Sequence, residues 1–247
     1  MRILFAAAAA LLMAAPVQSA ELKVWSGNGP RAAVQALCAE FERATGNKID
    51  LHFAVNPEVQ SKLEVGEAFD VVVGNPPTID ALIKAGKVVD GSRADIGRAG
   101  LGMAVRSGTA KPDISSVDAF KQALLKTNAV AFPGEGASGR YFVTLVDRLG
   151  IAAEMKSKLR PMPAEDTVEI VARGDADMVV VVATRIVDVP GVDLVGPIPE
   201  ALQTKIGFAA GLGVAAKEVD AAKALIRFLS APAAAATLKS KGVEPSS

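Results

Sequence analysis

The sequence of 247 residues has little of what metal sites and nucleophilic enzymes use most: one cysteine, Cys38, and one histidine, His52. A single cysteine cannot form a disulfide within the chain. Zinc clusters and Cys–His nucleophile pairs also need more of these residues. Cys38 falls on the apolar face of a predicted helix, so we expect a buried, inert thiol. His52 falls in an alternating strand pattern and is expected to be a structural or surface residue. We predict no metal site and no cofactor.

Charge of one sign and aromatic side chains are also scarce. The sequence balances 27 Lys and Arg against 27 Asp and Glu, contains no basic tract, and is only 4% aromatic. Nucleic-acid binding depends on clustered positive charge. The composition therefore argues against a nucleic-acid partner.

Long apolar runs are missing too, except at the start of the chain. Arg2 precedes the uniformly apolar segment 3–15, which is shorter than the ~20 residues needed to cross a bilayer core. The small residues Ser19 and Ala20 then suit a signal peptidase. We predict that residues 1–20 are a secretory signal peptide, cleaved after Ser19 or Ala20, rather than a buried helix. No cysteine stands at this site for lipid attachment, so we expect a soluble periplasmic protein that is not membrane-inserted.

Strand and helix patterns alternate through the rest of the chain, with turn residues between them. Strands are predicted at 22–25, 48–54, 70–74, 100–105, 128–132, 178–183 and 211–216. Helices are predicted at about 30–45, 57–66, 76–86, 117–124, 142–149, 167–172, 219–230 and 233–241. This alternation predicts an α/β fold with parallel strands covered by helices.

The segments 100–105 and 211–216 are near copies, and each begins Gly-Leu-Gly. Chance produces such similarity in a chain rich in glycine and alanine. The alternative is a pair of crossovers between two lobes, where small residues let strands pack closely. On that interpretation lobe I comprises residues 21–104 and 207–247, and lobe II comprises residues 105–206.

Small and polar residues follow several predicted strands, at the points where helices begin. In open α/β sheets, ligands bind beyond the carboxyl ends of the strands. Helix N-termini also present unpaired N–H groups that suit anions. We expect these turns to bind a small anion between the lobes, although each polar residue taken alone could be an ordinary helix cap. The candidates are Ser26, Asn28, Asn56, Ser138 and Thr167.

The segment 136–140, Gly-Ala-Ser-Gly-Arg, offers further candidates. Gly139 and Arg140 are expected near the anion, and Arg140 could bind a carboxylate or oxyanion bidentately or could simply be solvated. Ser138 stands where a hydrolase nucleophile elbow has its serine, but that motif needs glycine in place of Arg140. The only histidine lies in the other lobe. Hydrolysis through Ser138 therefore remains only an alternative.

The chain resembles the periplasmic molybdate-binding proteins of ABC importers, within the wider extracellular solute-binding proteins. The similarity rests on the first strand, turn and helix through Phe41 and Gly46, and on segments 63–73, 138–150, 163–166 and 228–235. It implies a two-lobed periplasmic-binding-protein fold, type II-like, with two crossover strands. Such a fold closes on an oxyanion and delivers it to a permease.

Carried over residue by residue, the resemblance implies ligand contacts that this sequence meets only in part. The first serine of the family falls at Gly29, which keeps only its backbone N–H, and the second falls near Asn56. Main-chain contacts fall at Ser138 and Thr167. A tyrosine hydroxyl of the family falls at Val182, whose side chain cannot donate. Either other donors compensate, or the ligand is not molybdate.

Together these observations predict a monomeric periplasmic binding protein of an ABC transporter, and not an enzyme. It would capture a small anion, either a molybdate-like oxyanion or a small organic anion, for an inner-membrane permease. The alternatives are a ligand-sensing protein for a membrane receptor and an exported hydrolase that uses Ser138.

Overall fold

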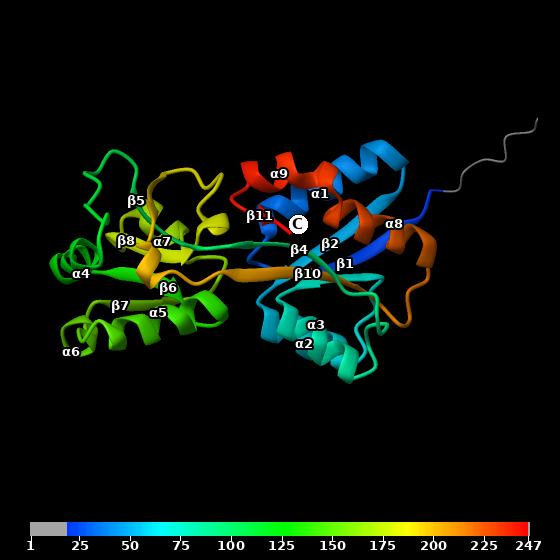
Figure 1. The fold of residues 1–247 in the computed structure, drawn as a ribbon, viewed down its shortest axis with the longest axis horizontal. Coiled ribbons are helices and arrows are strands. Elements are labelled where there is room, and N and C mark those ends of the chain that lie inside the picture. The colour runs from blue at the N-terminus through cyan, green and yellow to red at the C-terminus, as the bar shows by residue number, and fades with distance from the viewer. Residues whose placement is uncertain (1–18, 247) are drawn as a thin grey trace, which may run out of the picture.

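Two β-sheets, each with its own helices, divide the part of the chain that the computed structural model describes, residues 19–246 (Figure 1). The predicted signal segment lies outside the described residues, except for Ser19 and Ala20. The strand order is β11-β4-β10-β3-β1-β2 in the six-stranded sheet and β7-β6-β8-β5-β9 in the five-stranded sheet. We refer to the sheets with their helices as lobe I and lobe II.

The elements have the following bounds. The strands are β1 (Glu21–Gly27), β2 (Lys48–Ala54), β3 (Val71–Gly74), β4 (Ala94–Ala99), β5 (Leu101–Arg106), β6 (Val130–Pro133), β7 (Leu159–Met162), β8 (Met178–Val182), β9 (Val192–Pro197), β10 (Ile206–Leu212) and β11 (Glu244–Pro245). The α-helices are α1 (Arg31–Thr45), α2 (Asn56–Glu64), α3 (Pro76–Lys84), α4 (Val117–Lys126), α5 (Ala137–Arg148), α6 (Ala152–Met155), α7 (Glu169–Arg173), α8 (Val219–Ser230) and α9 (Ala235–Ser240). Short 3-10 turns cover η1 (Ala183–Arg185), η2 (Glu200–Leu202) and η3 (Pro232–Ala234).

The central strands confirm the predicted α/β pattern. β3 and β8 are buried along their whole length, as expected of strands that are covered on both faces. β1 pairs in parallel with β2 and β3, and β6 pairs in parallel with β7 and β8. The carboxyl ends of these parallel strands lead into the turns that face the other lobe, so the predicted edge for a ligand is the edge between the lobes.

Helix α1 covers one face of the lobe I sheet through Val34, Leu37, Cys38 and Phe41, which are all buried. The helix ends at Gly46, whose φ of 77° is the left-handed conformation that glycine adopts easily. Burial, with a smaller contribution from Glu42, raises the pKa of the Cys38 thiol to about 12. The predicted burial of Cys38 is therefore confirmed.

The chain crosses between the sheets twice, close to the predicted lobe boundaries after residues 104 and 206. β4 and β5 lie in different sheets, so the first crossover is at Gly100, and the predicted boundary after residue 104 falls inside β5. The second crossover spans residues 198–205, before β10. The segment 211–216 is therefore the end of β10 and the turn after it, in lobe I, and not a crossover strand. Figure 1 shows both crossings side by side between the lobes.

Gln203 joins the two crossovers. Its Nε2 donates to the carbonyl oxygens of Leu101, at 2.8 Å, and Ile198, at 3.3 Å, while its Oε1 accepts from the backbone N–H of Leu101 at 2.8 Å. The side-chain amide thus satisfies both backbone groups of the residue that begins β5. The two hinge segments are bound to each other as a pair.

Strands β4, β7, β9 and β11 and helix α6 were not predicted. β4 carries Asp95 and Arg98 among small residues, which hides its alternation. β7 contains Pro161, and a proline is tolerated there because β7 is the edge strand of its sheet. β9 lies at the opposite edge and is only half-buried.

Within residues 19–246, no single helix combines the length and the apolar composition of a membrane span. Helix α8 and the segment Pro232–Ser240 together meet that description, but they are bent by 55° at the break between them. The apolar face of α8 is buried in the core through Ala222, Leu225, Ile226 and Leu229.

Candidate functional site

A cleft between the two lobes is lined by the turns that follow the parallel strands. Its inner cavity has a volume of about 50 Å³ and its outer cavity a volume of about 620 Å³. Asn28, Val55, Glu135 and Ala164 line both cavities, so the two are parts of one cleft. The other residues that line the inner cavity are Gly29, Asn56, Asn75, Pro133, Gly136, Ala137, Ser138, Val181, Val182, Arg185 and Ile206.

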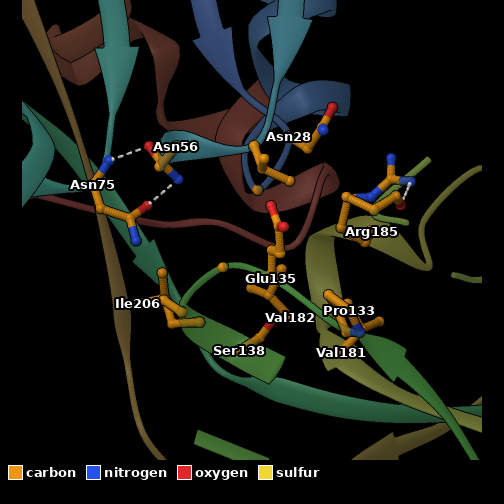
Figure 2. A pocket seen from close by; sticks show the side chains of 15 residues that line it. Asn28, Asn56, Asn75, Pro133, Glu135, Ser138, Val181, Val182, Arg185 and Ile206 are labelled. Atoms are coloured by element: carbon orange, nitrogen blue, oxygen red, sulfur yellow. Dashed lines mark hydrogen bonds between the residues drawn. The ribbon is translucent and has the colours of Figure 1, made fainter. Parts of the chain in front are cut away.

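Five of the nine predicted site residues therefore lie on this cleft: Asn28, Gly29, Asn56, Ser138 and Val182. Ser138 stands in the first turn of α5 and is 6% exposed. In Figure 2 it lies at the lower edge of the pocket, beneath Glu135. Val182 contributes an apolar wall, in keeping with its inability to donate a hydrogen bond.

The side chain of Asn56 forms its hydrogen bonds with another residue of lobe I, Asn75. Its Oδ1 accepts from the backbone N–H of Asn75 at 3.0 Å, and its Nδ2 donates to Asn75 Oδ1 at 3.1 Å (Figure 2). A Cβ at Gly27 or at Gly74 would lie within 3 Å of Asn56 Oδ1. Asn56 thus joins the turns after β1, β2 and β3, and shapes the cleft through packing and backbone position.

The structure places four predicted residues away from the cleft. Ser26 and Thr167 are fully buried and donate to the carbonyl oxygens of Gly27, at 3.0 Å, and Pro163, at 2.7 Å. Gly139 packs on β6, where a Cβ would lie 1.7 Å from the carbonyl oxygen of Pro133. The side chain of Arg140 is exposed and lines neither cavity. Its placement near the helix start was correct, but the side chain is on the outer face of α5.

Arg185, which sequence reasoning missed, is the arginine that lines the inner cavity. It is only 9% exposed, and its Nη2 donates to the carbonyl oxygen of Ala164 at 2.9 Å. Glu169 Oε1 lies 4.0 Å away, at the limit of an ion pair. Burial lowers the pKa of Arg185, while the charges of Glu169 and Glu165 act in the opposite direction. An arginine nevertheless stays charged in proteins, so the cleft holds a buried cation.

Arg31 brings a second guanidinium to the cleft, from the other lobe. It begins α1 and lines the outer cavity, where its Nη2 donates to Asn28 Oδ1 at 2.8 Å and the guanidinium lies 4.2 Å from the centre of the Phe53 ring. Burial lowers the pKa of Arg31, and the positive charge of Arg185 lowers it further. Two like charges from opposite lobes thus approach each other beside one cleft, an arrangement that a bound anion would stabilise.

The sequence signal for these arginines was the same strand-end rule used for the other candidates. Arg185 ends the 3-10 turn η1 that follows β8, and Arg31 follows the turn after β1. Neither arginine stands at the position where its strand ends, and the spacing in the sequence does not show that the turns after β1 and β8 aim both side chains at the cleft.

Glu135 is the charged residue that lines both cavities, and it too was missed; Glu58 and Glu165 line the outer cavity only. Glu135 lies in the turn after β6. In Figure 2 its carboxylate points up into the pocket, below Asn28 and to the left of Arg185. A carboxylate is therefore presented to the same space as the arginines.

Two other kinds of chemistry find no support in the cleft. Within residues 19–246, no group of three or more His, Cys, Asp and Glu side chains could hold a metal ion. His52, the only histidine, contacts Asp50 Oδ2 at 2.8 Å and stacks on Trp25 with the ring centroids 4.8 Å apart. It lines neither cavity, so the cleft brings no histidine base to Ser138.

Known proteins resemble this chain over most of its length. The family model described as bacterial extracellular solute-binding protein matches residues 22–244. An aconitate isomerase from Pseudomonas sp is 34% identical over 98% of this chain and 94% of the relative. The molybdate-binding protein ModA from Azotobacter vinelandii is 28% identical over 94% of this chain and 92% of the relative.

The fold comparison agrees with the sequence comparison. The solved structure of the Azotobacter vinelandii periplasmic molybdate-binding protein superposes with a TM-score of 0.78 and 17% identity, over 92% of this chain and 100% of that one. The predicted two-lobed architecture and the resemblance to molybdate-binding proteins are confirmed.

Proposed function

Because the chain belongs to the bacterial extracellular solute-binding proteins, we propose that its cleft captures a small polycarboxylate, with aconitate the first to be tested. The observation that carries this proposal is the approach of Arg31 and Arg185 from opposite lobes to one cleft. A guanidinium binds a carboxylate through two parallel hydrogen bonds. Two such groups favour a ligand with more than one carboxylate.

The residues that replace the family's hydroxyl donors support the same choice. The resemblance implies donors at positions 29 and 182, where this chain has glycine and valine. Val55, Pro133, Val181, Val182 and Ile206 make the inner wall largely apolar. Such a wall suits the carbon skeleton of an organic anion better than the four oxygens of a tetrahedral oxyanion, which need donors on every side.

The relative with the higher identity points the same way. Its name, aconitate isomerase, refers to a tricarboxylate. We propose that the protein works in the periplasm and passes its ligand to the permease of an ABC importer, as solute-binding proteins do in general. Loss of uptake of that polycarboxylate on deletion of the gene would support import. Unchanged uptake would favour the sensor alternative.

Ligand binding to the purified protein without residues 1–20 tests the proposal directly. Isothermal titration calorimetry should detect cis- or trans-aconitate, or the saturated analogue tricarballylate, more tightly than molybdate and sulfate. Arg185→Gln should weaken binding by about 10-fold or more, since a hydrogen bond to a charged group is worth ~1.5–3 kcal/mol. Arg185→Lys should recover only part of the loss, because lysine keeps the charge without the bidentate geometry.

Arg140→Gln is the matched control, and it decides between the sequence prediction and the structure. Arg140 stands outside both cavities, so this variant should bind like the wild type. Equal losses in Arg140→Gln and Arg185→Gln would contradict the assigned cleft. Tight molybdate binding with no response to any polycarboxylate would reject the proposed ligand class.

A second candidate function is isomerisation of the bound polycarboxylate. The name of the Pseudomonas relative suggests it, and the carboxylate of Glu135 inside the cleft favours it. This function would overturn the expectation that the protein is not an enzyme.

A further inference from the structure

Of the three carboxylates that line the cleft, Glu135 is the one that reaches the inner cavity, whereas Glu58 and Glu165 line only the outer one. The carboxylate of Glu135 rises into the space that the proposed ligand would occupy (Figure 2). Glu135 is exposed to the open cleft, and a ligand carboxylate brought beside it meets electrostatic repulsion. Capture alone would be better served by a neutral residue at this position.

The loop holds Glu135 in this position. Gly136 has a φ of 95°, a conformation that residues with side chains rarely adopt, and it is the residue just before α5. Gly134 donates its backbone N–H to the carbonyl oxygen of Met162 at 2.8 Å, which ties the other side of the loop to β7. The carboxylate is therefore presented from a turn that is fixed at both ends.

We infer that Glu135 is the group that moves a proton on a bound unsaturated polycarboxylate. This inference rests on the proposed function, because it assumes that a polycarboxylate occupies the cleft. The ligand must carry a methylene group between a carboxylate and a carbon–carbon double bond. The C–H bonds of such a methylene are acidified by both neighbours.

The reaction balances without any other reactant. The Glu135 carboxylate takes a proton from the methylene, and the C–H electron pair forms a new double bond to the adjacent carbon. The original double bond shifts its electrons to its far carbon, and the resulting carbanion is delocalised onto the carboxylates. The protonated Glu135 then returns the proton to that far carbon. The product is an isomer in which the double bond has moved by one carbon.

Other groups in the cleft suit this reaction. Arg31 and Arg185 supply two positive charges where negative charge builds up on the carboxylates of the ligand. Val181, Val182 and Ile206 make the inner wall apolar, which strengthens those interactions by excluding water. Glu135 lies among these groups, so one side chain can serve both ends of the three-carbon unit.

Proton NMR in D₂O tests the inference, with cis-aconitate as the probe and the protein without residues 1–20. The wild type should convert cis-aconitate to trans-aconitate and place deuterium on carbon during the conversion, beyond the rate without protein. Glu135→Gln should slow both processes by about 100-fold or more, the usual contribution of a general base. Its affinity for tricarballylate, which has no double bond, should stay the same or rise because the repulsion is removed.

Glu154→Gln is the matched control, because Glu154 is exposed on α6 and lines neither cavity. It should behave as the wild type, and thermal melting should show that both variants are folded. The inference is overturned if the wild type binds aconitate but catalyses neither conversion nor exchange. It is also overturned if Glu135→Gln converts aconitate at the wild-type rate. Absence of binding to any polycarboxylate is a different result, and it rejects the proposed function itself.

Discussion

The hydroxyl of Thr184 donates a hydrogen bond of 2.5 Å to the carbonyl oxygen of Gly29. Thr184 follows β8 in lobe II, and Gly29 follows β1 in lobe I, so this bond joins the lobes beside the inner cavity. An ion pair between Lys241 and Asp188, at 2.5 Å, is a second link between the C-terminal part of lobe I and lobe II. The Thr184 bond is the better protected of the two, because Thr184 is 1% exposed whereas Asp188 is largely open to solvent.

Replacement of Thr184 by valine should therefore make the closed arrangement of the lobes less stable. Valine has nearly the same shape but cannot donate, and a neutral hydrogen bond is worth ~0.5–1.5 kcal/mol. The dissociation constant for the ligand should rise by about 2- to 10-fold, as measured by calorimetry. Thr144→Val, on the exposed face of α5, should leave it unchanged. Equal affinity in the wild type and Thr184→Val would show that this bond does not favour closure.

Alanine at Gly139 should destabilise lobe II strongly. A Cβ there would lie 1.7 Å from the carbonyl oxygen of Pro133, so α5 must move away from β6. We expect a loss of about 3 kcal/mol in the free energy of unfolding, measured by urea denaturation. At Gly150, whose φ is 68° and where no atom lies within 4 Å of the added Cβ, alanine should lose only about 1 kcal/mol, from backbone strain alone. Similar losses at the two positions would contradict the steric explanation.

Leucine at Gln203 should weaken the joint between the crossovers. It removes the two bonds of 2.8 Å to Leu101 and takes away the partner of the buried Leu101 N–H, while the Leu101 carbonyl keeps a bond of 3.1 Å from the N–H of Ile198. A loss of about 1–3 kcal/mol in unfolding free energy is expected. The side-chain amide of Gln60 donates to Glu64 on the surface of α2, so Gln60→Leu should change the free energy of unfolding by less than about 0.5 kcal/mol. Equal stability of the two variants would contradict the prediction that the Gln203 hydrogen bonds stabilise the fold.

Stability should fall in acid partly through Asp177. Burial would raise the pKa of this carboxyl, but hydrogen bonds from Asn128, Thr127 and Ala129 outweigh burial and lower the pKa below 3.8. A carboxyl with a lowered pKa stabilises the folded state above its unfolded pKa, and this contribution is lost as the pH falls through the folded pKa. Asp177→Asn should thus be less stable than the wild type at pH 7, but it should lose less stability between pH 5 and pH 2. Urea midpoints across this range measure the difference, and parallel curves would contradict the prediction.

Much of the architecture was predictable because its central strands have a clear sequence pattern. Val71–Val73 and Met178–Val182 are short apolar runs with helices on either side, a pattern that parallel sheets impose. β4 and β7 were not predicted because their sequences resemble loops. β4 is charged and pairs with β10 through a bulge, and β7 is an edge strand that contains a proline. The crossover at Gly100 was placed within a few residues. The lobe boundary predicted before residue 207 lies at the start of β10, but the crossover strand predicted at 211–216 is wrong, because Gly-Leu-Gly at 211–213 packs β10 closely against its neighbours within one sheet.

The location of the candidate site and several of its polar residues were predictable from the sequence, but its charged residues were not. The rule that ligands lie beyond strand ends located Asn28, Asn56 and Ser138 on the cleft. It could not show that Asn56 is held by Asn75, since that contact joins two turns far apart in sequence. It also favoured Arg140 over Arg185. Within the first turn of α5, Ser138 faces the cleft whereas Arg140 faces the solvent. The path of η1 after β8 brings Arg185 into the cavity, and the sequence does not show that path.

The buried state of Cys38 has a practical consequence for measuring how the lobes move. A thiol with a pKa of about 12 is almost wholly protonated at neutral pH, and thiol-directed labels react with the thiolate. New cysteines on the surface of each lobe could therefore carry a spectroscopic pair without removal of the native one. The distance between two such labels, followed as aconitate is added, would report closure in a protein whose core is unaltered.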